Sequence, residues 1–100
     1  MHNLKCNKNQ TAQHKNSESC VITEFPINDN EINFAIAKIS SRYPDTGFVT
    51  NTICKEIVYI QEGMGKIVIN GVEYELNAGD SILIPPNGKF YWDGTVNNFV

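Results

Sequence analysis

GVEYELNAGDSILIPP, residues 71–86, is the stretch that decides the fold. Its first run, VEYEL, alternates apolar and charged residues, as expected of a strand with one face on a core and the other in water. Gly79 can take the backbone angles of a sharp corner, and the Asp80 carboxylate can accept hydrogen bonds from nearby amides. Pro85 cannot donate to a strand ladder, so the second run ends there. The stretch predicts two strands joined by a tight corner.

The β pattern extends from this stretch in both directions along the chain. Asn70-Gly71 lies between two strand-like runs and predicts a type I′ hairpin, because both residues tolerate a positive φ. KFYW and NNFV predict two short strands around a turn at Asp93-Gly94. Further strands are expected in CVITEF at 20–25, EINFAIAKIS at 31–40, where a strand is favoured over a helix, and ICKEIVYIQ at 53–61. Many short strands joined by Gly and Asn turns predict an all-β sandwich or barrel.

The amino-terminal part has a different character. Residues 1–19 are polar and lack periodicity, which predicts a flexible tail that could be deleted with little change in melting temperature. Residues 20–100 are then the folded domain. The possible metal ligands in and beside the tail are His2, Cys6, His14 and Cys20, and their spacing matches no zinc finger or ribbon.

Composition and charge exclude several classes of protein. Residues 1–20 carry three Lys and one Glu, and residues 21–100 carry five Lys or Arg and ten Asp or Glu. An acidic folded part without a basic cluster argues against binding to nucleic acid. The chain has neither an apolar run that could span a membrane nor an apolar secretory signal, and its three cysteines have no regular spacing. We therefore expect a cytoplasmic protein with no membrane partner.

The run EIVYIQEGMGKIVINGVEYELNAGDSILIPPNGKFYW, residues 56–92, resembles a cupin. The resemblance covers about residues 50–92 and rests on the order of its features: Glu56, then Gly63, the hairpin, the Gly79-Asp80 corner and the proline stop. It implies an all-β fold, a small double-stranded β-helix or jelly-roll barrel, with a ligand cavity inside.

Metal-binding cupins carry His-x-His and a Glu three or four residues later in one motif, and a further His beyond the proline corner. Counting back from Glu56, the resemblance puts the two first-motif positions on Thr50 and Thr52, or with the longer spacing on Val49 and Asn51. The second-motif position falls on Phe90. None of these is a histidine, and a single carboxylate beside hydroxyl groups does not hold a transition metal tightly. We therefore predict no metal and no cofactor.

The cavity of the resemblance is expected to be apolar and aromatic with one carboxylate. An unbroken strand would place the residues from Thr50 to Ile60 alternately inward, including Cys54 as a small buried hydrophobe. Phe90 and Trp92 would face them from the opposite side. The candidate ligand-binding residues are Thr50, Thr52, Glu56, Val58, Phe90 and Trp92.

Two kinds of function are open from these residues. One is a metal-free barrel that binds a sugar or another metabolite as a sensor or accessory protein. The other is a metal-independent enzyme such as a sugar epimerase or isomerase, in which acid and base roles would fall to Glu56, Tyr43 or Tyr59. A metal-dependent dioxygenase is disfavoured by the missing ligands. The apolar run at Ile57 to Ile60 and an open barrel edge also predict a homodimer, whose contact would include Ile57 or Tyr59.

Overall fold

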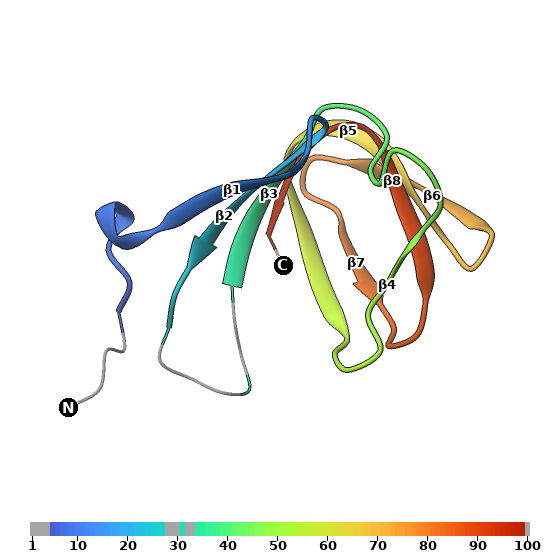
Figure 1. Cartoon of the computed structure of the whole chain (residues 1–100). Helices are drawn as coiled ribbons and strands as arrows, with labels where there is room; N and C mark the ends of the chain where they lie inside the picture. Colours follow the sequence, from blue (N-terminus) through green and yellow to red (C-terminus); the bar gives the residue numbers. More distant parts are fainter. Residues whose placement is uncertain (1–4, 28–30, 32–33, 100) are drawn as a thin grey trace.

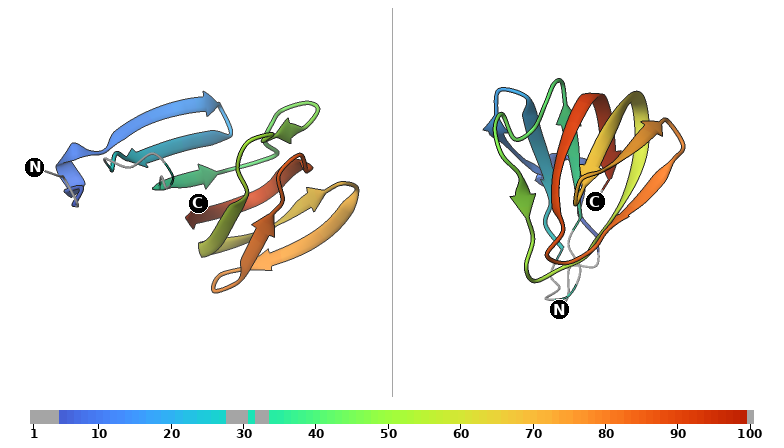
Figure 2. Two further views of the ribbon diagram at one scale, coloured as in Figure 1. Left: turned by 90° about the horizontal axis from the view of Figure 1, so that it is seen from below. Right: turned by 90° about the vertical axis from the view of Figure 1, so that its right-hand side faces the viewer.

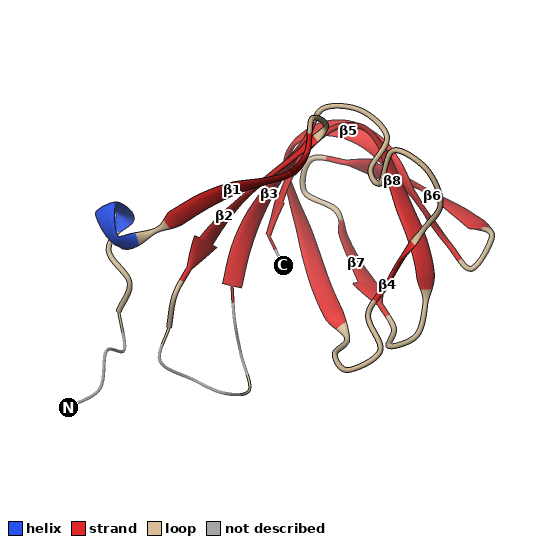
Figure 3. Ribbon diagram, viewed as in Figure 1, coloured by secondary structure: helices blue, strands red, loops and turns tan. Residues whose placement is uncertain are grey.

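The computed structural model describes residues 5–27, 31 and 34–99 and consists almost entirely of antiparallel strands (Figure 3). Residues 1–4 of the predicted tail and Val100 at the end of NNFV lie outside the described residues. The strands are β1 Ala12–Ser17, β2 Cys20–Phe25, β3 Phe34–Ile39, β4 Val49–Thr50, β5 Glu56–Ile69, β6 Val72–Asn77, β7 Ser81–Ile84 and β8 Lys89–Phe99. One 3-10 turn, Lys8–Gln10, precedes them. None of the described residues belongs to a helix long and apolar enough to cross a membrane.

The sheet curls into two walls joined by its two longest strands. Its order is β1-β2-β3-β8-β5-β6, with β4 paired to β8 and β7 paired to β5. In Figure 1, β5 and β8 lie side by side at the top, β1 to β3 form one wall, and β4, β6 and β7 form the other. The views of Figure 2 show the β1–β2 hairpin at one end of this arrangement. The expected jelly-roll barrel of the cupin type is confirmed.

The hairpin and the corner of the opening stretch are confirmed by the backbone. Asn70 and Gly71 have φ values of 51° and 82°, as a type I′ turn requires. Gly79 has a φ of 95°, and Asp80 Oδ2 accepts a 2.7 Å hydrogen bond from the Asn77 amide. Of the apolar residues on β6, only Leu76 is buried, so the hairpin joins the core at its base.

The predicted turn at Asp93-Gly94 is wrong, because β8 runs through it as a single strand. Gly94 pairs with Gly65 of β5, and its φ is 109°. The two backbones approach so closely that a Cβ on Gly94 would lie 2.5 Å from the Gly65 Cα atom. Asp93-Gly94 therefore allows a close approach of two long paired strands and does not reverse the chain.

The flexible tail predicted for residues 1–19 is wrong for residues 12–17. These residues form β1, which pairs antiparallel with β2 from Ala12↔Glu24 to Ser17↔Cys20. All but one of its side chains are exposed, so the segment has no apolar periodicity. Backbone pairing orders it at the edge of the sheet, where few side chains need to be apolar.

The core lies between the two walls, and β5 faces it with alternate residues. Val58 and Ile60 are completely buried. Ile57 and Tyr59, which alternate with them, are 63% and 48% exposed. Leu83 of β7 pairs directly with Ile57 and is 55% exposed, so the outer face of these two strands is apolar.

Candidate functional site

A cavity of about 210 Å³ lies inside the barrel. Both walls and the loops between them contribute to it. Its lining residues are Asn16, Cys20, Ile22, Ala35, Ala37, Ile39, Tyr43, Val49, Glu56, Phe90 and Trp92. The lining is mostly apolar, with a few polar groups contributed by loops and strand ends, as is common in small-molecule pockets.

The aromatic side of the cavity comes from β8. Phe90 and Trp92 are 4% and 5% exposed, and their rings meet edge to face with centroids 6.5 Å apart. The Trp92 backbone is also tied to Tyr43 by two hydrogen bonds, of 2.8 and 2.9 Å. These bonds fix the loop that carries Tyr43 against the strand that carries Trp92.

Tyr43 and Cys20 are both in their protonated forms at neutral pH. Burial raises the pKa of the Tyr43 phenol, the neighbouring Cys20 raises it further, and a hydrogen bond from the Asn16 side chain lowers it. Burial alone raises the pKa of the Cys20 thiol to about 11. Tyr43 can therefore donate a hydrogen bond or a proton, and Cys20 behaves as a small apolar residue.

Glu56 lies at the start of β5 and supplies the carboxylate that the sequence predicted for the cavity. Its Oε1 atom is 3.4 Å from the Asn51 side-chain amide. Asn51 also organises the loop between β4 and β5, because its Oδ1 accepts hydrogen bonds from the amides of Ile53 and Cys54. Its carbonyl oxygen accepts a 2.7 Å hydrogen bond from the Asn87 amide.

This loop contradicts the unbroken strand expected between Thr50 and Glu56. The turn held by Asn51 separates β4 from β5 and leaves Thr50, Thr52 and Cys54 exposed and outside the cavity lining. The expectation that Cys54 is buried is wrong for the same reason. Local side-chain capping by Asn51 competes with the strand ladder, which residue alternation cannot reveal.

Three of the six predicted site residues do lie together. Glu56, Phe90 and Trp92 line the cavity, whereas Val58 belongs to the fully buried core. Tyr43, considered from the sequence as an acid or base, also lines the cavity. Tyr59, the other tyrosine considered, lies on the outer face of β5.

The donor set does not fit the metal site of metal-binding cupins. Val49 and Phe90 line the cavity at two of the expected histidine positions, and Asn51 stands at a third, beside Glu56. The longer of the two motif spacings, which falls on Val49 and Asn51, therefore agrees with the structure. The only possible metal ligands that it places near each other are the Glu56 carboxylate and the Asn51 amide. In the part of the chain that the structure describes, no three His, Cys, Asp or Glu side chains are grouped so as to hold a metal ion. That the cavity binds no metal stays a prediction.

The sequence did not indicate the contribution of the first wall. Asn16 was assigned to the tail, and Ile22, Ala35, Ala37 and Ile39 were expected only as strand residues. The alternation of Cys20 and Ile22 in CVITEF could have placed these two residues on a core face. Asn16 had no such signal, because its position depends on a local irregularity of β1.

Comparison with known proteins gives a consistent family. Residues 51–96 match the family model described as Cupin domain. No curated protein matches the sequence. A Streptomyces PAC13 variant solved with uridine has a TM-score of 0.87 at 18% identity, over 99% of this chain and 79% of that one. PAC13 itself is described as a unique nucleoside dehydratase.

Two other solved structures have the same fold. KdgF from Halomonas sp. has a TM-score of 0.73 at 12% identity, covering 94% of this chain and 88% of that one. An RmlC-like cupin from Shewanella frigidimarina has a TM-score of 0.72 at 18% identity, covering 93% and 85%. At these identities the likeness establishes the fold and not the activity. The family match and the shared fold together show that this chain contains a small domain of the cupin superfamily.

Proposed function

We propose that this cupin domain binds a small neutral molecule in its barrel, without a metal, as a sensor or accessory protein. The observation that carries the proposal is that one cavity is lined both by two aromatic rings, Phe90 and Trp92, and by the polar groups of Tyr43 and Glu56. A cytoplasmic location is part of the same proposal, since Cys6, Cys20 and Cys54 are free thiols and fit a reducing compartment.

The size of the cavity limits the ligand. Pockets for drug-sized molecules have volumes of about 300–1,000 Å³. The volume here is about 210 Å³, which suits a nucleobase, a monosaccharide or a compact nucleoside. The structural similarity to a protein solved with uridine makes uridine a reasonable first probe.

The charge of the cavity limits the ligand further. Glu56 is the only Asp, Glu, Lys, Arg or His among the described lining residues. An anionic ligand would meet a carboxylate in a partly desolvated site without any cation to compensate it. Neutral ligands that accept a hydrogen bond from Tyr43 or donate one to Glu56 are favoured.

Trp92 allows a direct binding assay, because it is the only tryptophan in the chain and it lines the cavity. Titration with uridine, free uracil and a panel of monosaccharides should change its fluorescence saturably for at least one of them. Native mass spectrometry of freshly purified protein should show a carried ligand of similar size. A wild-type protein that responds to none of these probes and carries nothing would contradict the proposed function.

The role of Glu56 can be separated from a general effect of charge. Glu56→Gln should weaken binding about tenfold, the order expected for one hydrogen bond to a charged group. Glu75→Gln removes an exposed carboxylate on β6 outside the cavity and serves as the matched control. Equal affinities of the two variants would show that Glu56 does not contact the ligand.

A second candidate is a metal-independent enzyme, favoured by the presence of Tyr43 and Glu56 in the same cavity. Glu56 would remove a proton from a substrate carbon, and Tyr43, protonated at neutral pH, would return a proton either to the opposite face of that carbon or to a neighbouring hydroxyl group that leaves. The result would be an epimerisation, or an elimination in which the protonated group leaves as water. Nuclear magnetic resonance of substrate panels in deuterated water distinguishes the two candidates, because an enzyme incorporates deuterium or forms product and a binding protein does neither.

A further inference from the structure

The β1–β2 pairing contains a bulge at a position that matters for the cavity. The register runs through His14↔Ile22 and Lys15↔Val21 and then shifts, so that Ser17 pairs with Cys20. Asn16 is the extra residue of this bulge. Bulges re-aim a side chain relative to the regular alternation and are frequent next to functional sites. Here Asn16 lines the cavity from an exposed position on the edge strand.

Asn16 and Tyr43 both line the cavity, and the Asn16 side chain is exposed at its rim. A hydrogen bond with the Asn16 side chain lowers the pKa of the Tyr43 phenol, which is the effect expected of an amide N–H that donates to the phenol oxygen. This leaves the O–H of Tyr43 to donate in another direction, while the Asn16 Oδ1 atom remains an acceptor. The pair thus offers one hydrogen-bond donor beside one acceptor.

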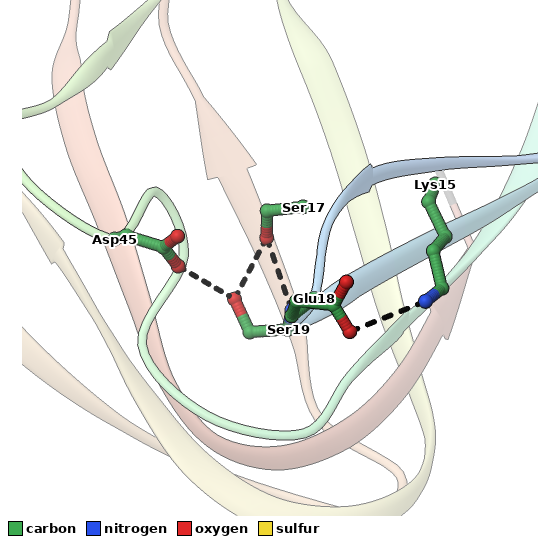
Figure 4. Close-up of polar contacts among 5 residues, drawn as sticks. All are labelled: Lys15, Ser17, Glu18, Ser19 and Asp45. Carbon is green, nitrogen blue, oxygen red and sulfur yellow. Dashed lines mark hydrogen bonds and ion pairs between the residues drawn. The ribbon is translucent and has the colours of Figure 1, made fainter.

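A cluster of polar contacts lies next to both partners along the chain, and Figure 4 shows its side chains Ser17, Ser19 and Asp45. The Ser19 hydroxyl, only 4% exposed as a residue, lies 2.8 Å from the Arg42 carbonyl oxygen and 3.2 Å from Asp45 Oδ1. Ser17 Oγ lies 2.9 Å from the same hydroxyl and accepts a hydrogen bond from the Ser19 amide. One end of this cluster is next to Asn16 and the other is next to Tyr43. We call it the Ser19 cluster, comprising Ser17, Ser19, Asp45 and the Arg42 carbonyl.

We propose that the bulge delivers Asn16 as a recognition residue, and that Asn16 and Tyr43 together bind a neutral ligand group carrying an acceptor beside a donor. The amide or imide edge of a base and the vicinal hydroxyls of a sugar have this pattern. Ser19 is a positioning residue that acts through Tyr43. This inference rests on the proposed function. It assigns ligand recognition to Asn16 and Tyr43, which precede the part of the chain, residues 51–96, that matches the family model.

The test uses Trp92 fluorescence with uridine and uridine monophosphate on the full chain. Uridine should bind, and the monophosphate should bind at least tenfold more weakly, because the cavity has no cationic lining residue among those described. Asn16→Ala and Tyr43→Phe should each weaken uridine binding about tenfold. The double variant should be little weaker than either single one, because the two residues act as a unit.

Two further variants guard against misfolding and unrelated effects. Asn16→Asp keeps the size of the side chain and removes the donor, so it should weaken binding as Asn16→Ala does. Gln13→Ala changes an exposed residue of the same strand that lies outside the cavity lining and should leave the affinity unchanged. Uridine binding with the same affinity in Asn16→Ala and wild type would overturn the inference and leave the proposed function standing. Absence of binding by every neutral probe in the wild type would overturn both.

The role of Ser19 is tested without any ligand. In Ser19→Ala, hydrogen exchange should accelerate at the amides of Tyr43 and Trp92, which hydrogen-bond each other's carbonyls. The Asn70 amide, which donates to the Lys89 carbonyl at the start of β8, is the internal control and should stay unchanged. Uniform acceleration at all three amides would mean that Ser19 only stabilises the fold, and its role as a positioning residue would be wrong.

Discussion

Replacing Gly94 with alanine should destabilise the protein more than the same change at the described positive-φ glycines that have open space around them. The added Cβ would lie 2.5 Å from the Gly65 Cα atom and 2.8 Å from the Met64 carbonyl oxygen. Both are backbone atoms of β5 and cannot rotate away. The φ of 109° adds backbone strain for any residue with a Cβ.

The magnitude follows from two separate costs. The unfavourable φ costs about 1–3 kcal/mol. Forcing a methyl group into packed backbone costs about 1–3 kcal/mol more. Gly94→Ala should therefore lower the free energy of unfolding by about 2–6 kcal/mol, a large part of the roughly 5–15 kcal/mol that stabilises a typical domain.

Gly79→Ala is the matched control. Gly79 has a similar φ of 95°, but nothing lies within 4 Å of the position that an added Cβ would take, so it should lose only the backbone term. Urea unfolding followed by Trp92 fluorescence measures both variants. The difference of about 1–3 kcal/mol corresponds to about 4–24 °C in Tm for a chain of this size. Equal stabilities of the two variants would refute the close contact between β5 and β8.

Four further predictions follow from the described contacts. Deleting residues 1–19 should lower Tm by well over a few degrees, because it removes β1 and the polar cluster beside it; an unchanged Tm would restore the view of a dispensable tail. Iodoacetamide at pH 8 should label the exposed Cys54 and spare Cys20, as peptide mass spectrometry would show. The pKa of Cys20 rises from 9.0 to about 11 on folding, so its contribution to stability is complete below pH 9 and is lost as the pH rises through 11. Light scattering should give the mass of a homodimer. Leu83→Lys places a charge in the apolar patch that Leu83 forms with Ile57, and it should produce monomers without a large loss of Tm. A wild-type monomer at all concentrations would contradict this contact.

Local sequence determined the features that depend on neighbouring residues. Asn70-Gly71 specifies its turn because both residues accept positive φ, and the Gly79-Asp80 corner closes through a side chain three residues from its partner amide. The alternation in β5 correctly separated Val58 and Ile60 from Ile57 and Tyr59, since strand side chains alternate between faces whatever the partner strand is. The pattern of strands and turns left a sandwich or a barrel open, and the resemblance of their order to a cupin predicted the barrel.

Only the tertiary structure decided which residues reach the cavity. Gly94 follows Asp93 as in a turn, and only the pairing of β8 with β5 shows that it faces the Gly65 backbone. Asn51 interrupts a strand because its side chain accepts a hydrogen bond from the Cys54 amide and its carbonyl oxygen accepts one from the Asn87 amide. Asn16 belongs to a polar segment whose order comes from backbone pairing with β2, which composition does not record. Its place beside Tyr43 depends on one extra residue in that pairing. Register between distant strands is fixed by the whole sheet, so the recognition side of the cavity could not be derived from local pattern.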